Sequence, residues 1–446
     1  MFPARASVAD SGVADAPLDS VLADGTSRAT GRYLGGYLEL DVTVPPGEQK
    51  TITVFTTGYQ NDDEESEGSS LASSSPLSLP PDRRREFTRD KWNEYLDPVE
   101  TASVPSRYAE QYVRSVIGIS MLYDPASGSI SAAPNSQPTY YLSWPRDGAF
   151  IAIALAEAGL TDIAKDYLVN FCATIQEQDG SFEQCYASTG EPMGVIAVEN
   201  DQPPIYPHAV RTVYDLTRDQ SFLREVWPVV ERAADYTVGA VVDNGLLAAT
   251  HDFAEMWTDA RQSIWTNAFA YRGLLDAASL AERVDADGTA ERSRAAERYR
   301  NAARTIGNAV ESRLFEGVDD GFATHLSITG PEQHENTAFS VAIHPTGWAE
   351  RYDHVEELFD AFRSFSRSTT ERWLPCEFMY AAALYNDGRI DEGDAILDRF
   401  GSECLPGGTL AETVDEDGNH RYAALGWSNA GFVHAIHERH RNRRSE

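Results

Sequence analysis

The stretch YYLSWPRDGAFIAIALAEAG, residues 140–159, decides the fold class of this chain. Its second half, from Phe150 to Ala158, is apolar nearly all round, and Gly159 follows as a residue of the kind that ends helices. A helix that is apolar on every side must be enclosed by other elements. We therefore predict an inner helix here, preceded by a loop rich in aromatic and polar residues.

A second helix is amphipathic and indicates an outer position. Between residues 295 and 314, apolar residues recur at helical spacing, at Ala295, Tyr299, Ala302, Ile306, Val310 and Leu314. Further helical runs are expected at 106–122, 161–176, 207–217, 220–240, 264–283, 353–365, 375–387, 390–400 and 427–441, with almost no strand signal among them. Helices that arrive in pairs, joined by loops of unequal length, suggest a toroid of helical hairpins with its site at one rim.

The N-terminal part follows a different pattern. GYLELDVTV (36–44) and QKTITVFTTGY (49–59) alternate apolar and polar residues, which predicts two strands. The stretch that follows, NDDEESEGSSLASSSPLSLPPD, is too polar to bury a core. We expect a short β-rich segment over 1–60, an acidic Ser/Pro-rich linker over 61–90 and a helical domain over 91–446.

Composition excludes several classes of function. The net charge of −33 disfavours nucleic acid and anionic membranes as partners, and no apolar run approaches the roughly 18 residues of a membrane span. The first residues lack the pattern of an export signal, so a cytoplasmic protein is expected unless an upstream segment exists. The four cysteines form no CxxC pair and are predicted to be buried thiols.

The acidity itself has two interpretations. An acidic surface stays soluble at high salt, where the screening length falls to about 3 Å at 1 M. Adaptation to high salt is the interpretation that we favour, and it points to a halophilic archaeon as the source. The alternative is a surface matched to a cationic partner. It is weaker because the acidic residues are spread along the whole chain.

Two segments far apart in the sequence carry the carboxylates that suggest an enzyme. THDFAEMWTDA (250–260) holds Glu255 and Asp259 beside Trp257, and GGTLAETVDEDG (407–418) holds Glu412. Paired carboxylates in Gly- and aromatic-rich loops suit acid/base cleavage of a glycosidic bond. The DEDG run is better explained as a hairpin turn than as part of a calcium loop, and the histidines lack zinc spacing. No metal and no cofactor is therefore expected.

Other residues suit the recognition of a sugar. Arg146 and Asp147 offer donors beside an acceptor for vicinal hydroxyls, and Trp144 offers a flat face for a pyranose ring. The alternative is that Arg146 and Asp147 form only an ion pair at the start of a helix. Asp201 could accept from hydroxyls or take a turn or capping role, and Trp427 could form a wall of the sugar site.

The chain resembles the glucoamylase-like enzymes of glycoside hydrolase family 15 over roughly residues 92–440. The resemblance is carried by YDPASGSISAAP, YYLSWPRDGAF, VENDQPPIYPHAV, EMWTDA, WLPCEFMYAAALYNDGRIDEG and TLAETVDEDGNHRYAALGWSNAGFVHAI. It implies an (α/α)6 barrel and an inverting, exo-acting hydrolase of α-linked glucose. It also implies a preceding β-sandwich, of which residues 30–60 look like only the closing strands.

The resemblance also implies roles for single residues. Glu412 matches the catalytic base, and Tyr140, Trp144, Arg146 and Asp147 match the subsite for the terminal glucose. The family usually places its general acid directly after the tryptophan, where this chain has Thr258. Asp259 or Glu255 could replace it. We favour Asp259, because a Trp-x-Asp-Ala segment also resembles the α-1,6-glucosidase domain of glycogen debranching enzymes.

The expected activity is release of glucose from the non-reducing ends of α-glucans or oligosaccharides. Two alternatives remain open. The same barrel could act as an α-1,6-glucosidase, a trehalase or a glucodextranase, or it could bind glycans without cleaving them because Thr258 occupies the usual acid position. The sequence does not indicate an oligomeric state.

Overall fold

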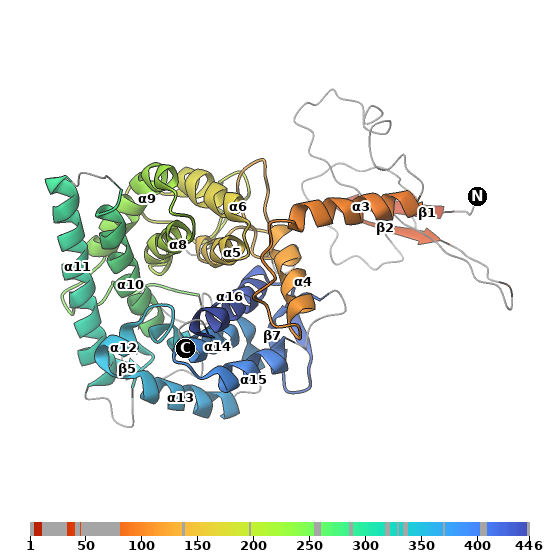
Figure 1. Ribbon diagram of the computed structural model, residues 1–446. Helices are drawn as coiled ribbons and strands as arrows, with labels where there is room; N and C mark the ends of the chain where they lie inside the picture. The colour runs from red at the N-terminus through yellow and green to blue at the C-terminus, as the bar shows by residue number, and fades with distance from the viewer. Residues whose placement is uncertain are drawn as a thin grey trace. The chain divides into compact units, whose positions relative to one another are not determined.

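A computed structural model describes the following residues: 4–10, 34–40, 45, 81–135, 139–195, 198–253, 260–284, 289–316, 322–327, 330–332, 338–368, 371–401 and 408–443. Contacts divide the chain into two compact units, Met1–Tyr95 and Leu96–Glu446 (Figure 1). Each unit is described by itself.

The N-terminal unit contains a two-stranded antiparallel sheet and a long helix. Strand β1 (Ala4–Asp10) pairs with β2 (Leu34–Leu40). β2 overlaps the strand predicted at 36–44, but its partner is residues 4–10, and the second predicted strand at 49–59 lies outside the described residues. Helix α3 (Pro81–Leu96) includes residues 81–90, where the sequence indicated a linker. Its Arg, Glu and Lys residues favour a helix without giving it an apolar stripe, so periodicity could not reveal it.

The second unit is mainly helical, as predicted. Its helices, including the π-helical turns η3 and η5 and the 3-10 helix η6, are α4 (Ala109–Ser120), α5 (Pro145–Glu157), α6 (Thr161–Asp166), η3 (Tyr167–Phe171), α7 (Cys172–Ile175), α8 (Gln202–Thr217), α9 (Gln220–Gly239), α10 (Ile264–Ala281), α11 (Ala290–Val310), η5 (Glu311–Phe315), η6 (Ala338–Ala342), α12 (Trp348–Tyr352), α13 (Val355–Ser368), α14 (Leu374–Asn386), α15 (Ile390–Phe400) and α16 (Gly426–Arg443).

Within the described residues, inner elements of this unit close into a ring. α5 packs on α8, α8 on α10, α10 on η6, η6 on α14, α14 on α16, and α16 returns to α5. The helices between them in sequence, such as α9, α11 and α15, lie outside this ring (Figure 1). Every residue of α5 except Phe150 is buried, whereas α11 buries a single stripe, as expected for inner and outer helices.

Close backbone approach brings two inner helices together. A Cβ added to Gly273 of α10 would lie 2.1 Å from the backbone oxygen of Pro204 at the start of α8. Only a residue without a side chain fits that spacing. The neighbouring inner helices α8 and α10 therefore touch along their backbones.

Two small sheets lie at helix starts. One contains β3 (Gln262–Ser263), β4 (His325–Ser327) and β5 (Gly330–Glu332), and the other contains β6 (Glu371–Trp373), β7 (Ala411–Asp415) and β8 (His420–Ala423). β3 runs directly into α10 and β6 into α14. β7 and β8 form a hairpin around the DEDG run, where the Asp415 carboxylate accepts hydrogen bonds from the backbone N–H groups of Asp417 and Asn419. The hairpin-turn prediction is thus confirmed.

The side chains of Cys172, Cys185 and Cys376 are buried, as predicted, while Cys404 lies outside the described residues. Among the helices that the structure describes, none combines the length and the apolar character needed to cross a bilayer.

Candidate active site

Aromatic side chains gather where the inner helices begin. Trp144 and Trp373 directly precede α5 and α14, and Trp427 is the second residue of α16. The ring of Trp427 stacks on Phe150 at 5.0 Å between centroids and meets Trp373 edge to face, also at 5.0 Å. Trp265, in the first turn of α10, lies 5.7 Å from Trp427. These contacts bring the N-terminal ends of α5, α10, α14 and α16 to one place.

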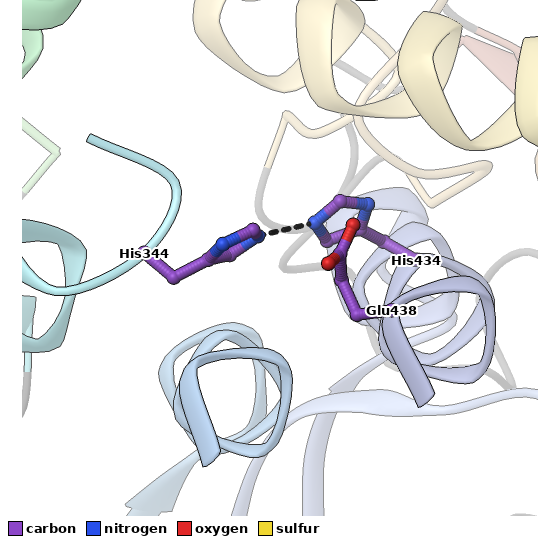
Figure 2. Close-up of side chains that lie close together, drawn as sticks. All are labelled: His344, His434 and Glu438. Carbon is purple, nitrogen blue, oxygen red and sulfur yellow. Dashed lines mark hydrogen bonds between the residues drawn. The ribbon is translucent and has the colours of Figure 1, made fainter. Parts of the chain in front are cut away.

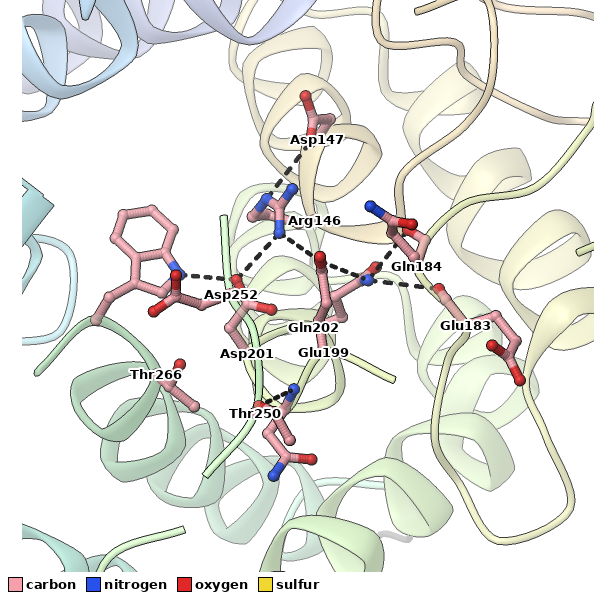
Figure 3. Close-up of polar contacts among 12 residues, drawn as sticks. Arg146, Asp147, Glu183, Gln184, Glu199, Asp201, Gln202, Thr250, Asp252 and Thr266 are labelled. Carbon is pink, nitrogen blue, oxygen red and sulfur yellow. Dashed lines mark hydrogen bonds and ion pairs between the residues drawn. The ribbon is translucent and has the colours of Figure 1, made fainter. Parts of the chain in front are cut away.

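A buried guanidinium stands among carboxylates beside this aromatic layer (Figure 3). Nη1 of Arg146 donates to Glu199 Oε2 at 2.7 Å and to Asp201 Oδ2 at 3.3 Å. Nε of Arg146 lies 3.5 Å from Asp147 Oδ2, so the ion pair considered from the sequence does form. All four side chains are less than a tenth exposed. The cluster thus sets three carboxylates against one guanidinium.

Asp201 is one of the carboxylates that contact Arg146 in this cluster. Its side chain is fully buried and makes no capping hydrogen bond to α8. Oδ2 also accepts from Trp265 Nε1 at 2.8 Å, whereas Oδ1 has no hydrogen-bond partner among the described residues. Burial, opposed by the attraction of Arg146, raises the pKa of Asp201. The contacts therefore give Asp201 a positioning task for Arg146 and Trp265, while its expected contact with sugar hydroxyls stays a prediction.

Both oxygens of Glu412 are held. Tyr140 Oη donates to Oε2 at 3.0 Å, and Trp373 Nε1 donates to Oε1 at 3.1 Å. The ring of Tyr140 also meets Trp144 edge to face at 5.8 Å. Trp144 Nε1 is a buried donor that has no hydrogen-bond partner in the described part of the chain. Three of the predicted site residues, Tyr140, Trp144 and Glu412, are therefore neighbours although the chain separates them by up to 272 positions.

The candidate general acids lie on a segment whose two ends reach this site. Glu255, Trp257 and Asp259 themselves are outside the described residues. Just before the segment, Phe253 stacks on Trp373 at 5.0 Å and meets Trp265 at 4.6 Å. Just after it, Arg261 forms a buried ion pair with Asp252 at 3.2 Å.

Sequence analysis missed several residues of this site. Trp373 could have been found from the sequence. A Trp stands directly before α14 and a Pro follows in its first turn (Trp373-Leu374-Pro375), as in Trp144-Pro145 at the start of α5. Glu199, Trp265 and Phe253 have no such signal. Their contacts with Arg146, Asp201 and Trp373 join residues that local patterns cannot connect.

At one end of the ring of helices, aromatic faces lie beside a buried Arg–carboxylate cluster and an oriented carboxylate, which are groups that suit a ligand with many hydroxyl groups. The model of the glycosyl hydrolases family 15 matches residues 106–395, well over half of the chain. The chain belongs to this family of glycoside hydrolases.

Relatives and solved structures agree with that assignment. An uncharacterized glycosyl hydrolase of Methanocaldococcus jannaschii is 37% identical over 123 residues, which are 28% of this chain and 20% of the relative. A bacterial glucoamylase complexed with acarbose has a TM-score of 0.63 at 14% identity, covering 82% of this chain and 60% of that one. A glucoamylase of Hormoconis resinae has a TM-score of 0.59 at 13% identity, covering 75% and 73%.

These structural likenesses show a shared fold. The chain spans about a fifth of the length of its archaeal relative and three fifths of the bacterial glucoamylase.

Proposed function

We propose that the protein is an inverting, exo-acting hydrolase that releases glucose from the non-reducing ends of α-glucans or α-linked oligosaccharides. The observation that carries this proposal is the orientation of Glu412. Tyr140, from the loop before α5, and Trp373, at the start of α14, hold its two oxygens, and Phe253, which precedes the segment bearing Asp259, stacks on Trp373. A fixed carboxylate opposite a second carboxyl group is the arrangement that glycoside hydrolysis with inversion requires.

In the proposed reaction, the carboxyl group of Asp259 protonates the glycosidic oxygen as the bond from C1 to that oxygen breaks. Glu412 takes a proton from a water molecule, whose oxygen attacks C1 from the opposite face. The products are glucose of inverted configuration and a shortened sugar. The proton then returns from Glu412 to Asp259 through water. The two carboxyl groups should stand roughly 6.5 to 9.5 Å apart, which leaves room for the water.

We further propose that the ring of inner helices is an (α/α)6 barrel and that its aromatic end holds the terminal glucose. Tyr140 and Trp144 would provide the faces of this subsite, and Arg146 with Asp147 would provide donors and an acceptor for hydroxyl groups. The unpartnered Nε1 of Trp144 suits this role, because a buried donor gains most from a partner that a ligand brings. Trp257 and Trp427 would form further walls.

Activated substrates test the assignment of the two carboxyl groups. Asp259→Asn should lower kcat on maltotriose by about 10²- to 10⁴-fold, the range for loss of a general acid or base. The same variant should keep most of its activity on α-glucosyl fluoride, because fluoride leaves without being protonated. Glu412→Gln should lose activity on both substrates.

A Glu255→Gln variant provides the matched comparison. If Glu255→Gln shows the loss that fluoride rescues, and Asp259→Asn does not, then Glu255 is the acid and our assignment is wrong.

One observation favours a second candidate function, that of a glycan-binding barrel without hydrolysis. Thr258 stands where the family usually has its acid. A product panel of maltooligosaccharides, isomaltooligosaccharides, panose and trehalose separates the possibilities. Release of glucose from maltooligosaccharides supports our proposal, and cleavage of only α-1,6 bonds or only trehalose identifies the related hydrolases. Binding without any cleavage identifies the binding barrel.

A further inference from the structure

A cavity of about 570 Å³ opens inside the helical ring, toward the C-terminal ends of the inner helices. Phe150 and Trp427 line it at the end nearest the candidate active site, and later turns of α8, α10, α14 and α16 line the rest. Two histidines and one glutamate, which take no part in the proposed reaction, lie together on its wall. They are His344, His434 and Glu438.

The ligand atoms of these three residues converge (Figure 2). One ring nitrogen of each histidine and one carboxylate oxygen of Glu438 all lie within 4.8 Å of one another. His434 and Glu438 are four residues apart on α16, so they share a face of that helix. His344 comes from the segment between η6 and α12 and places its Nε2 2.9 Å from Nε2 of His434.

A buried carboxylate fixes the orientation of His434. Nδ1 of His434 lies 2.9 Å from Oε2 of Glu157, whose side chain is fully buried. Because a carboxylate accepts, Nδ1 carries a proton and donates it, which leaves Nε2 to face His344. Metal-binding histidines are commonly held in this way, with the second ring nitrogen donating to a carboxylate.

Arg441 joins Glu438 to the carboxylate that orients His434. Arg441 donates to Oε1 of Glu438 and, through its other terminal nitrogen, to Oε1 of Glu157 at 2.6 Å. Arg441 thereby keeps both carboxylates in place. The two histidines, Glu438 and the cavity then form a three-ligand site with an open position.

We propose that His344, His434 and Glu438 bind a divalent transition-metal ion of the zinc type. Two imidazole nitrogens and one carboxylate oxygen are a ligand set that Zn²⁺ uses, with a fourth position that water from the cavity can fill. Without the ion, the two Nε2 atoms share one proton in a hydrogen bond. The ion replaces that proton, which moves to Nδ1 of His344 or to water.

Binding requires the three ligand atoms to adjust, because they now lie within 4.8 Å of one another, whereas the ligand atoms of a tetrahedral zinc ion are about 3.3 Å apart. Zinc–nitrogen bonds are about 2.0 to 2.1 Å long, so in a tetrahedral site the two Nε2 atoms must separate by a few tenths of an ångström from their present 2.9 Å. The ion would tie the segment after η6 to the last helix, across 90 positions of sequence. These three residues do not show the short sequence spacing of known zinc motifs, because they come together only in the folded chain.

Metal titration tests the proposal directly. The full-length protein is treated with a chelator, dialysed, and titrated with Zn²⁺ by calorimetry and with Co²⁺ by visible absorption. We expect one ion per chain, a Kd near or below about 1 µM, and a Tm that rises when metal is added, because an ion that binds only the folded state stabilises it. Failure to find saturable binding in the wild-type protein overturns the proposal.

Variants locate the ion. His344→Gln and Glu438→Gln should each weaken Zn²⁺ binding by about 100-fold or more, while His440→Gln, on the same helix α16 but outside the set, should leave it unchanged. Equal affinity in the double variant His344→Gln/Glu438→Gln and in the wild type would show that the ion binds elsewhere and would refute the site.

X-ray absorption of the zinc-loaded wild type decides the case even if a variant does not fold. Two imidazole ligands support the proposal, and a shell of oxygen alone contradicts it.

Discussion

Glu412 is the residue on which the proposed chemistry depends, and its two oxygens are fixed by different elements. Tyr140 comes from the loop before α5, and Trp373 directly precedes α14. A carboxylate held by two donors keeps one orientation, which in the proposed reaction would direct the activated water in line toward C1. The geometry of the base therefore depends on the relative placement of two inner helices.

Removal of one of these donors should lower the rate more than the affinity. Tyr140→Phe deletes the hydroxyl group that donates to Glu412 and keeps the ring. A hydrogen bond to a charged group contributes about 1.5 to 3 kcal/mol, so kcat on maltotriose should fall by about 10- to 100-fold with a smaller change in KM. Tyr141→Phe, at the exposed neighbouring position, is the control. A KM effect that exceeds the kcat effect would mean that Tyr140 mainly binds sugar.

Glu377 gives a pH dependence that is independent of catalysis. It is buried in α14, and burial, opposed by Arg372 at 3.5 Å, raises its pKa from 4.5 to about 7. The folded state thus binds the proton more tightly than the unfolded state does. The resulting stabilisation is present below pH 4.5 and is lost as the pH rises to about 7.

In Glu377→Gln this loss should disappear. The decrease in the free energy of unfolding between pH 5 and pH 8 should be smaller than in the wild type by about 2 kcal/mol, as measured by urea denaturation. Glu297→Gln, on the exposed face of α11, is the control. A wild-type pH dependence that persists in Glu377→Gln would contradict the raised pKa.

At this scale, the sequence allowed prediction of those site residues that lie in specific motifs. Tyr140, Trp144, Arg146 and Asp147 come from a single motif. The structure places Tyr140 on Glu412, Trp144 against Tyr140, Arg146 over Trp427 and Asp147 beside Arg146, while their contacts with sugar stay predictions. The positions of Glu199 and Trp265 could not be predicted, because their partners Arg146 and Asp201 are 53 and 64 residues away. Asp201 was predicted as a sugar ligand, but its burial behind Arg146 could not be read from a local pattern.

At the scale of secondary-structure elements, the close contact between α8 and α10 fixes the spacing of these two inner helices. Gly273→Ala adds a methyl group only 2.1 Å from the backbone oxygen of Pro204, which cannot move as a side chain can. Overpacking of this kind costs about 1 to 3 kcal/mol, so Tm should fall and urea unfolding should occur at lower concentration. Gly239→Ala, at the end of α9, meets nothing within 4 Å and should be neutral or slightly stabilising.

Because both positions are helical, alanine gains the same helix propensity in each. A Gly273→Ala variant as stable as Gly239→Ala would show that α8 and α10 are not in close contact.

The prediction of elements succeeded where periodicity was strong. The inner helix α5 and the outer helix α11 followed from apolar residues on all sides and from a single stripe, respectively. Strand β6 was not predicted, and for β7 and β8 the sequence indicated only the hairpin turn between them, because strands of three to five residues are too short to show alternation. The α3 helix was missed although it is long, because it is mostly polar and its few apolar residues form no continuous stripe.

The whole molecule carries a net charge of −33, which affects its stability. Like charges repel in the compact state, and salt screens that repulsion over about 10 Å at 0.1 M and 3 Å at 1 M. Salt also weakens the many surface ion pairs, but such pairs contribute little individually. Tm should therefore rise by more than about 5 °C between 0.1 and 2 M KCl, measured by calorimetry. A Tm that stays constant or falls would contradict adaptation to high salt.

The configuration of the released glucose tests the central claim most directly, because it reports on the relative placement of the two carboxyl groups. Proton NMR follows the anomers of glucose during the first minutes of maltotriose hydrolysis by the wild-type protein, before mutarotation mixes them. If Glu412 activates water opposite the acid on the 254–259 segment, β-glucose should appear first. Initial release of α-glucose, or binding of maltotriose without any release, would contradict it.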